Sequence, residues 1–115
     1  MPKVEFSPLA LEDLQEIRHY ITTYWDEKIS KRILKKIMTE IRVLEENPKA
    51  GVNLAKVIEV PTDYRYLFTE KNYVFYRLGF DKIRVVRILN ERQDYMMQLF
   101  GINTEEEDEY WKENE

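Results

Sequence analysis

The stretch Lys82–Phe100, KIRVVRILNERQDYMMQLF, joins an apolar β-branched run to an abrupt polar cluster and then to a second apolar run. Successive side chains of a strand point to opposite faces. Both faces of the first run are mostly apolar, so we expect this strand to be central in a sheet. The polar cluster Asn90–Asp94 predicts a turn, and Asp94–Asn103 predicts a short helix. The alternation assigns one face to Ile83, Val85, Arg87 and Leu89 and the other to Arg84, Val86, Ile88 and Asn90.

Three further β-rich runs precede this strand, and short polar segments separate them. Tyr64–Glu70 and Tyr73–Gly79 are joined by Lys71-Asn72, and the second run reaches Lys82 through Phe80-Asp81. Short turns of this kind imply antiparallel hairpins. The earliest run, Ala55–Val60, is predicted as one more strand.

Two amphipathic helices are predicted ahead of the strands. Ser7 suits an N-cap and Pro8 suits the first helical position, whose missing N–H donor is not needed there. The apolar face then comprises Ala10, Leu14, Ile17, Ile21 and Tyr24, with Glu12, Asp13, Glu16 and His19 largely elsewhere. Asp26 is the expected N-cap of the second helix and Asn47-Pro48 its end. Its stripe is Ile29, Ile33, Ile37, Ile41 and Leu44.

Together these elements predict an α+β fold in a single domain over residues 1–103. An N-terminal strand and a helical hairpin pack on a three- to four-stranded, mainly antiparallel sheet, and a short C-terminal helix follows. The remaining residues, 104–115, contain seven acids and one lysine. Acidic termini of this kind are usually solvated, so we expect a disordered tail.

Composition narrows the class of protein. The chain of 115 residues has no cysteine, which removes disulfides, thiol chemistry and cysteine-type zinc sites. We predict no cofactor and no metal. No apolar run approaches the roughly 18–20 residues that a membrane span needs, so a cytoplasmic protein without membrane contact is expected. Residues 1–103 carry 17 bases and 15 acids, a net charge of only +2.

Three segments in this order resemble the RelE/ParE superfamily, the toxin halves of type II toxin–antitoxin (plasmid stabilisation) systems. They are LALEDLQEIRHYI (9–21), DYRYLFTEKNYVFYRL (63–78) and VVRILNERQDYMMQLF (85–100). The resemblance covers roughly Lys3–Gly101. It implies a bacterial growth inhibitor that is held inactive by a cognate antitoxin laying a helix or strand across it. The RelE-like branch cleaves messenger RNA on the ribosome, whereas the ParE-like branch poisons DNA gyrase.

Cleavage of RNA needs a base for the 2′-hydroxyl, cations for the phosphate and an acid for the leaving oxygen. Carried over from the RelE-like branch, Arg65 preserves one charge, but a second lysine falls at Leu67 and an arginine at Tyr73 or Val74. A further cation falls at Asn90, which carries no charge. The tyrosine beyond it falls at Met96, one place from Tyr95. The resemblance therefore favours a ParE-like toxin that binds its target.

Several residues are candidates for these roles. For binding an anionic partner, we expect Arg65, Arg77 and Arg87 to converge on the sheet face that the helices leave uncovered, with Asn90 and Arg92 nearby. The partner would be RNA, a gyrase surface or the acidic part of an antitoxin. The simpler alternative is that arginine stems cover apolar sheet while their heads pair with acids. If the chain is an mRNA endoribonuclease instead, the remaining catalytic candidates are Arg65, Arg87, Glu91, Arg92 and Tyr95.

The cluster Met96, Met97, Leu99 and Phe100 is larger than a short helix normally hides. We expect it to dock on the sheet edge, or to accept the antitoxin or a second copy of the chain as a homodimer. The aromatic residues of the hairpins are expected to form core and cross-strand pairs. The lone histidine, His19, is expected to be a solvated surface residue. A relative without toxicity that only binds an antitoxin is the third interpretation.

Overall fold

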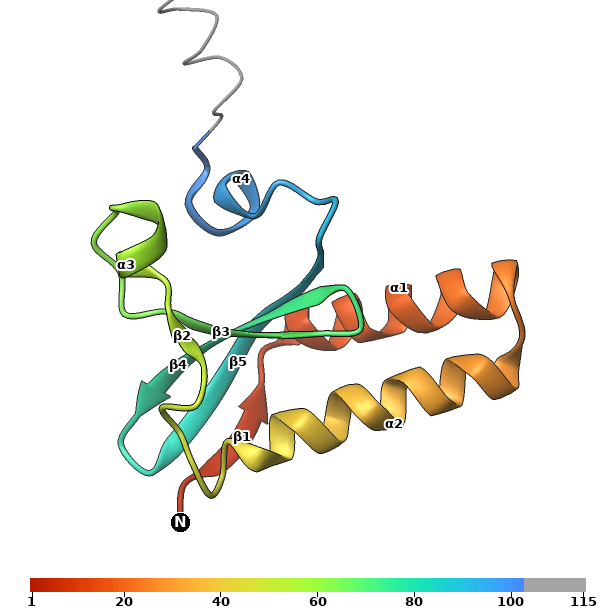
Figure 1. The fold of residues 1–115 in the computed structure, drawn as a ribbon, viewed down its shortest axis with the longest axis horizontal. Coiled ribbons are helices and arrows are strands. Elements are labelled where there is room, and N and C mark those ends of the chain that lie inside the picture. The colour runs from red at the N-terminus through yellow and green to blue at the C-terminus, as the bar shows by residue number, and fades with distance from the viewer. Residues whose placement is uncertain (103–115) are drawn as a thin grey trace, which may run out of the picture.

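The computed structural model describes residues 1–102, so the predicted acidic tail lies outside the described residues. The elements in chain order are β1 (Lys3–Phe6), α1 (Pro8–Tyr24), α2 (Glu27–Val43), β2 (Val52–Asn53), α3 (Ala55–Ile58), β3 (Arg65–Thr69), β4 (Asn72–Gly79), β5 (Lys82–Asn90) and α4 (Tyr95–Phe100). The strands form one sheet in the order β1-β5-β4-β3-β2. The predicted α+β fold class is thereby confirmed, with two helices before the sheet and one short helix after it (Figure 1).

β5 is an interior strand of the sheet, as predicted from its two apolar faces, because β1 pairs with it in parallel on one side and β4 antiparallel on the other. β3 and β4 form the predicted antiparallel hairpin. The two-residue strand β2 pairs antiparallel with β3 at the edge of the sheet and brings the sheet to five strands.

The helical hairpin begins where the sequence places it. Ser7 Oγ accepts a hydrogen bond from the Ala10 N–H at 3.0 Å, and Asp26 Oδ1 accepts one from the Ile29 N–H at 2.7 Å. These two caps satisfy backbone donors that a helix leaves unpaired. α1 and α2 then run side by side and extend past the sheet at the end where the hairpin turns (Figure 1).

One face of the sheet packs against this hairpin. Its core contains Ala10 of α1, Ile37 and Ile41 of α2, and Leu44 directly after α2. Five strand residues complete the cluster: Val74, Tyr76, Ile83, Val85 and Ile88. The stripe predicted for α2 is therefore confirmed at Ile37, Ile41 and Leu44, which are fully buried. Tyr24 was expected on the inward face, but its side chain is 69% exposed because it lies where the hairpin overhangs the sheet.

The other face carries a second core made by aromatic strand residues and the short helices. Leu54, Phe75 and Leu89 are fully buried there. Around them pack Ile58 of α3, the aromatic side chains of β3 and β4, and three residues of α4: Tyr95, Leu99 and Phe100. Figure 1 shows α3 and α4 beside one another over this side. The helix α4 thus docks on a sheet face and not, as predicted, on a sheet edge.

The strand predicted for Ala55–Val60 is wrong, since Ala55–Ile58 forms the helical turn α3. The Asn53 side chain accepts a hydrogen bond from the Ala55 N–H at 3.1 Å, which turns the chain immediately after β2. Glu59 then adopts a left-handed conformation with φ of 58° and ends the turn. Asn53 therefore offers the backbone a local partner that competes with pairing in the sheet.

No helix of the described residues is long and apolar enough to cross a membrane.

Candidate functional site

The junction between β5 and α4 is built by side chains that cap backbone groups. Asn90 Oδ1 accepts a hydrogen bond from the Arg92 N–H at 3.0 Å, and the Asn90 N–H donates to Gln93 Oε1 at 2.8 Å. Asp94 then caps α4 by accepting from the Met97 N–H at 3.2 Å. The polar cluster is therefore a turn followed by a helix cap, as the sequence predicts.

A β-bulge in β5 moves Arg87 away from its predicted face. Tyr76 lies opposite Val85 and Phe75 lies opposite Arg87, so Val86 is an extra residue without a partner on β4. Beyond the bulge every side chain exchanges faces relative to a regular strand. Arg87 therefore lies opposite Phe75, and Ile88 joins Ile83 and Val85 in the core under the helices.

The guanidinium of Arg87 is held by Asp13 of α1. Arg87 Nε and Nη2 donate to the two Asp13 carboxylate oxygens at 2.8 and 3.0 Å, and the side chains are 16% and 7% exposed. The hydrogen bonds to Asp13 raise the pKa of Arg87 above its ordinary value, although burial opposes the shift. Asp13 was expected outside the buried face, so this pair corrects the prediction for both residues.

Asp13 also provides a hydrogen-bond partner for the backbone at an edge of β5 that no strand covers. β1 ends at Phe6, beyond which the upper half of β5 has no neighbouring strand on that side. The Ser7 hydroxyl donates to the Val86 carbonyl at 2.7 Å, and the Ile88 N–H donates to Asp13 Oδ2 at 2.8 Å. Side chains of the first turns of α1 thus replace the hydrogen bonds that a longer β1 would make.

Arg65 lies on the opposite side of the sheet from Arg87. It pairs with Tyr76, which belongs to the core under the helices, and its Nη1 donates to the Gly51 carbonyl at 3.0 Å. The buried Tyr76 hydroxyl accepts from the Gly51 N–H at 2.9 Å and donates to the Pro48 carbonyl at 2.9 Å. Arg65 and Tyr76 together hold the loop between α2 and β2.

Arg77 lies near the turn between β4 and β5, directly opposite Arg84. Its guanidinium makes a 2.8 Å ion pair with Asp63 and lies 5.6 Å from the centre of the Tyr64 ring. The hydrogen bond to Asp63 raises the pKa of Arg77. Arg77 and Asp63 are both largely exposed, so the pair contributes little to stability.

The predicted convergence of Arg65, Arg77 and Arg87 is therefore wrong. Arg65 is paired with Tyr76 of β4, and Arg77 is the next residue of that strand. Adjacent residues of a strand point to opposite faces, so Arg65 and Arg77 lie on opposite faces of the sheet. Arg87 is turned to Asp13. The simpler alternative, in which the arginine heads pair with nearby acids, describes Arg77 and Arg87, and Arg65 is bound to a backbone carbonyl.

Tyr95 and Phe100 fix α4 to the sheet. The Tyr95 ring meets the rings of Tyr73 and Phe75 edge-on at 5.4 and 5.3 Å, and Phe100 stacks on Tyr64 at 5.8 Å. Burial raises the pKa of the Tyr95 hydroxyl. The hairpin aromatics form cross-strand contacts as predicted, including Tyr66 with Tyr73.

Those contacts leave the apolar cluster of α4 divided. Leu99 and Phe100 pack on the second core, whereas Met97 is 45% exposed and faces away from it. Of the four residues expected to bind an antitoxin or a second copy, Leu99 and Phe100 are therefore used within the chain, and Met96 is half-buried.

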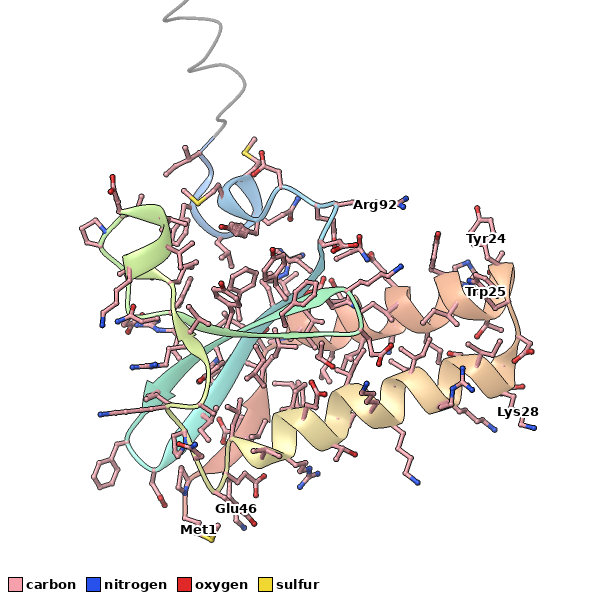
Figure 2. The ribbon with its side chains drawn as sticks, in the orientation of Figure 1. Met1, Tyr24, Trp25, Lys28, Glu46 and Arg92 are labelled. Atoms are coloured by element: carbon pink, nitrogen blue, oxygen red, sulfur yellow. The ribbon has the colours of Figure 1, made fainter. Side chains whose placement is uncertain are left out.

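A cleft of about 780 Å³ lies between the overhanging end of the helical hairpin, the β3–β4 turn and the loop after β5. Its apolar lining comes from Ile17, Ile21, Ile29 and Ile33, with the exposed rings of Tyr20 and Trp25 at the far end; Asn90, Glu91 and Arg92 line the opposite side. In Figure 2, Arg92 stands above the sheet and Tyr24 and Trp25 stand at the end of the hairpin.

Asn72 gives this cleft an unusual polar group. It is 4% exposed and lines the cleft, and its amide nitrogen donates to the Glu70 carbonyl at 2.7 Å. The Asn72 Oδ1 acceptor has no hydrogen-bond partner among the described residues. Buried polar groups are normally paired, so this acceptor is able to take a hydrogen bond from water or from a group bound in the cleft.

Sequence reasoning identified Asn90, Glu91 and Arg92 but missed the rest of this cleft. The isoleucines were assigned to a continuous core, and nothing in their spacing shows that the helices outrun the sheet. His19 is exposed, as predicted.

Comparisons with known proteins agree with the fold described above. Residues 4–95 match the family described as the ParE toxin of type II toxin–antitoxin systems, parDE. The protein is thus a toxin of the RelE/ParE superfamily. Within that superfamily, the chain belongs to the ParE toxin family.

Among solved structures, a chain from a chromosomal ParDE toxin–antitoxin system of P. aeruginosa is similar with a TM-score of 0.67. The two chains are 20% identical, and the match covers 78% of this chain and 96% of that one. At this identity the similarity shows the fold. A search of curated protein sequences found no match.

Proposed function

We propose that this toxin stops bacterial growth by stoichiometric binding to a macromolecular target, DNA gyrase, and not by cleaving messenger RNA. The observation that carries the proposal is the separation of the candidate catalytic residues. Arg65 lies on the helix-covered face against Gly51, whereas Arg87 is tied to Asp13 near the end of β5. A phosphodiester-cleaving site needs its cations and its base around one phosphate.

The chemistry of the remaining candidates supports the same conclusion. Tyr95 packs against Tyr73 and Phe75, so its ring serves to fix α4 to the sheet. The side-chain oxygen of Asn90 already accepts a hydrogen bond from the Arg92 N–H within the turn, and the side chain carries no charge. Glu91 and Arg92 are exposed neighbours in that turn, far from the pairing positions of Arg65.

For target contact we propose Arg92 together with Asn90, at the rim of the cleft. Arg92 is exposed and makes no ion pair with the described residues, so its charge is available to an acidic surface. Arg77 is proposed as a second contact, separate from Arg92. Its side chain is exposed, although its guanidinium is already paired with Asp63. Arg65 and Arg87, also expected to bind the target, act in this proposal by holding the fold.

For the cognate antitoxin we propose the cleft as the principal binding site, filled by an amphipathic helix. An apolar stripe of such a helix fits the isoleucine lining, and a polar side chain on it would donate to Asn72 Oδ1. Met96 and Met97 of α4 are proposed as a further contact, either for the antitoxin or for a second copy of this chain.

The deciding experiment has a cellular and a purified arm. Expression of the chain alone is expected to induce DNA-damage signalling before translation falls. The purified protein is expected to inhibit gyrase supercoiling at a ratio near one per enzyme, and Arg92→Glu to weaken this inhibition more than the exposed control Lys49→Glu. Indifference of gyrase at saturating protein would reject the target.

Two other outcomes would assign the alternatives. Cleavage of ribosome-bound message with gyrase unaffected would make the chain an endoribonuclease with an altered residue set. Growth without defect, together with tight antitoxin binding, would make it a relative that has kept only partner recognition.

A further inference from the structure

The solvent-facing side of α2 is basic along its whole length. Six cations, one threonine and the half-exposed Val43 share this side with no acid, and at 3.6 residues per turn they fall within an arc of about 140°. Glu27 and Glu40 lie outside the arc, one on each border. The members of this basic face are Lys28, Lys31, Arg32, Lys35, Lys36 and Arg42, around Thr39.

The basic face is exposed and only weakly neutralised. All six cations are exposed, and the distance along the helix from Lys28 to Arg42 is about 21 Å at 1.5 Å per residue. Three make ion pairs with surface acids, at 3.8 Å for Lys31, 3.0 Å for Lys36 and 3.6 Å for Arg42. Lys28, Arg32 and Lys35 make none with the described residues.

The net charge of α2 is opposite in sign to that of the whole protein. The helix carries six bases and two acids, a charge of +4, whereas the full chain has a charge of −4, so the remainder carries −8. A general attraction to polyanions is therefore not expected from the chain as a whole. Any such attraction has to come from a localised surface.

The composition of the basic face decides which kind of partner fits it. Protein–protein interfaces are depleted of lysine and gather aromatic and apolar anchors in their centre. This arc has four lysines and no aromatic side chain, and its one apolar side chain, Val43, lies at the C-terminal end of the helix and not in the centre of the face. A surface made almost entirely of cations fits a regular array of phosphates, whose binding depends on the number of lysines and arginines that neutralise them.

We propose that the basic face of α2 binds the phosphate backbone of nucleic acid without sequence preference. Over 21 Å of axis a DNA duplex carries about 12 phosphates, enough for each of the six cations to meet one on the near side. The face lies on the hairpin that extends past the sheet, and Lys28 marks its outer end in Figure 2. The proposal does not depend on gyrase being the target.

The test measures the full-length protein against a short fluorescein-labelled DNA duplex and, separately, a single-stranded RNA. The charge-reversal variant Lys28→Glu/Lys35→Glu is compared with Lys49→Glu/Lys56→Glu, which makes the same change of net charge at exposed positions outside α2. Fluorescence anisotropy gives affinity between about 50 and 200 mM salt. Urea unfolding confirms that both variants are folded.

The α2 variant is expected to lose about tenfold or more in DNA affinity and about two units of salt slope, one for each cation removed. The control should stay within about twofold of the unchanged protein at the same salt. Tighter binding to one of the two probes then identifies the nucleic acid.

Three results would overturn the proposal. The first is absence of binding to both probes at low salt, and the second is equal loss in the two variants. The third is displacement of DNA by polyglutamate at equal charge concentration, since that would assign the face to an acidic protein segment.

Discussion

Asp13 joins the first helix to β5 through two kinds of group: it accepts hydrogen bonds from the Arg87 guanidinium and from the Ile88 backbone N–H, both at 2.8 Å. Arg87 extends the link to α4 through Gln98 Oε1 at 3.3 Å. One carboxylate therefore connects α1, β5 and, through its partner, α4.

Removing this carboxylate should destabilise the protein strongly. Asp13→Ala leaves both Arg87 and the Ile88 N–H without their partner in a mostly buried position, so we expect a loss of about 3–5 kcal/mol in the free energy of unfolding. Glu12→Ala, next along α1 but exposed, is the control and should change it by less than about 0.5 kcal/mol. Urea midpoints measure both. A loss under about 1 kcal/mol for Asp13→Ala would show that the pair is dispensable.

Glycine is required at position 51 by a close approach. A Cβ there would lie 2.5 Å from Tyr76 Oη and 2.7 Å from the Tyr66 carbonyl, and the latter is backbone that cannot rotate away. We expect Gly51→Ala to cost about 1–3 kcal/mol in thermal or urea unfolding. Gly79→Ala is the matched control, because its nearest neighbour, Lys82 Cβ, is 3.9 Å away. Equal effects of the two substitutions would contradict the steric explanation.

Tyr76 should make stability fall at alkaline pH. Burial raises its pKa above the ordinary 10.0, so the unfolded chain releases this proton first. The stabilisation is complete below pH 10 and is lost as pH rises through the folded-state pKa. Tyr76→Phe should lower stability at neutral pH, because the Gly51 and Pro48 hydrogen bonds are lost. It should also flatten the alkaline decline, and an unchanged decline would place its origin in other groups.

Docking of α4 should depend on Tyr95 far more than on Met97. Tyr95→Ala removes a ring in contact with Tyr73 and Phe75, and for a partly buried aromatic we expect a cost of about 2 kcal/mol. Met97→Ala, at 45% exposure, should cost less than about 0.5 kcal/mol. If Met97 contacts an antitoxin or a second copy, as proposed, its substitution should instead weaken that association, measured by calorimetry.

Sequence alone predicts the parts of this protein that depend on local rules. Ser7 and Asp26 cap helices because their side chains reach donors three residues away, and the α2 stripe repeats every three or four positions. The position of Arg87 could not be predicted in this way. Its face depends on a bulge at Val86, which lies in a β-rich run with no glycine to mark it.

The candidate site was predicted in part for a similar reason. Asn90, Glu91 and Arg92 follow the end of a strand and form a recognisable turn. The cleft behind them exists because α1 and α2 are longer than the sheet they cover, and this mismatch depends on packing between distant segments. The same applies to Asp13, whose partner lies 74 residues away along the chain.

The pairing of β1 with β5 also sets the order in which the molecule can fold during synthesis. Among residues 1–102, β5 is the last strand to be made, yet it lies between β1 and β4, and without it β1 and the hairpin of β3 and β4 have no common sheet. At about 5–20 residues per second, the ribosome needs ~2–10 s to proceed from the end of α2 to Asn90. Throughout that interval the apolar stripes of α1 and α2 have no sheet to cover them. The fold is therefore completed only after β5 has been translated.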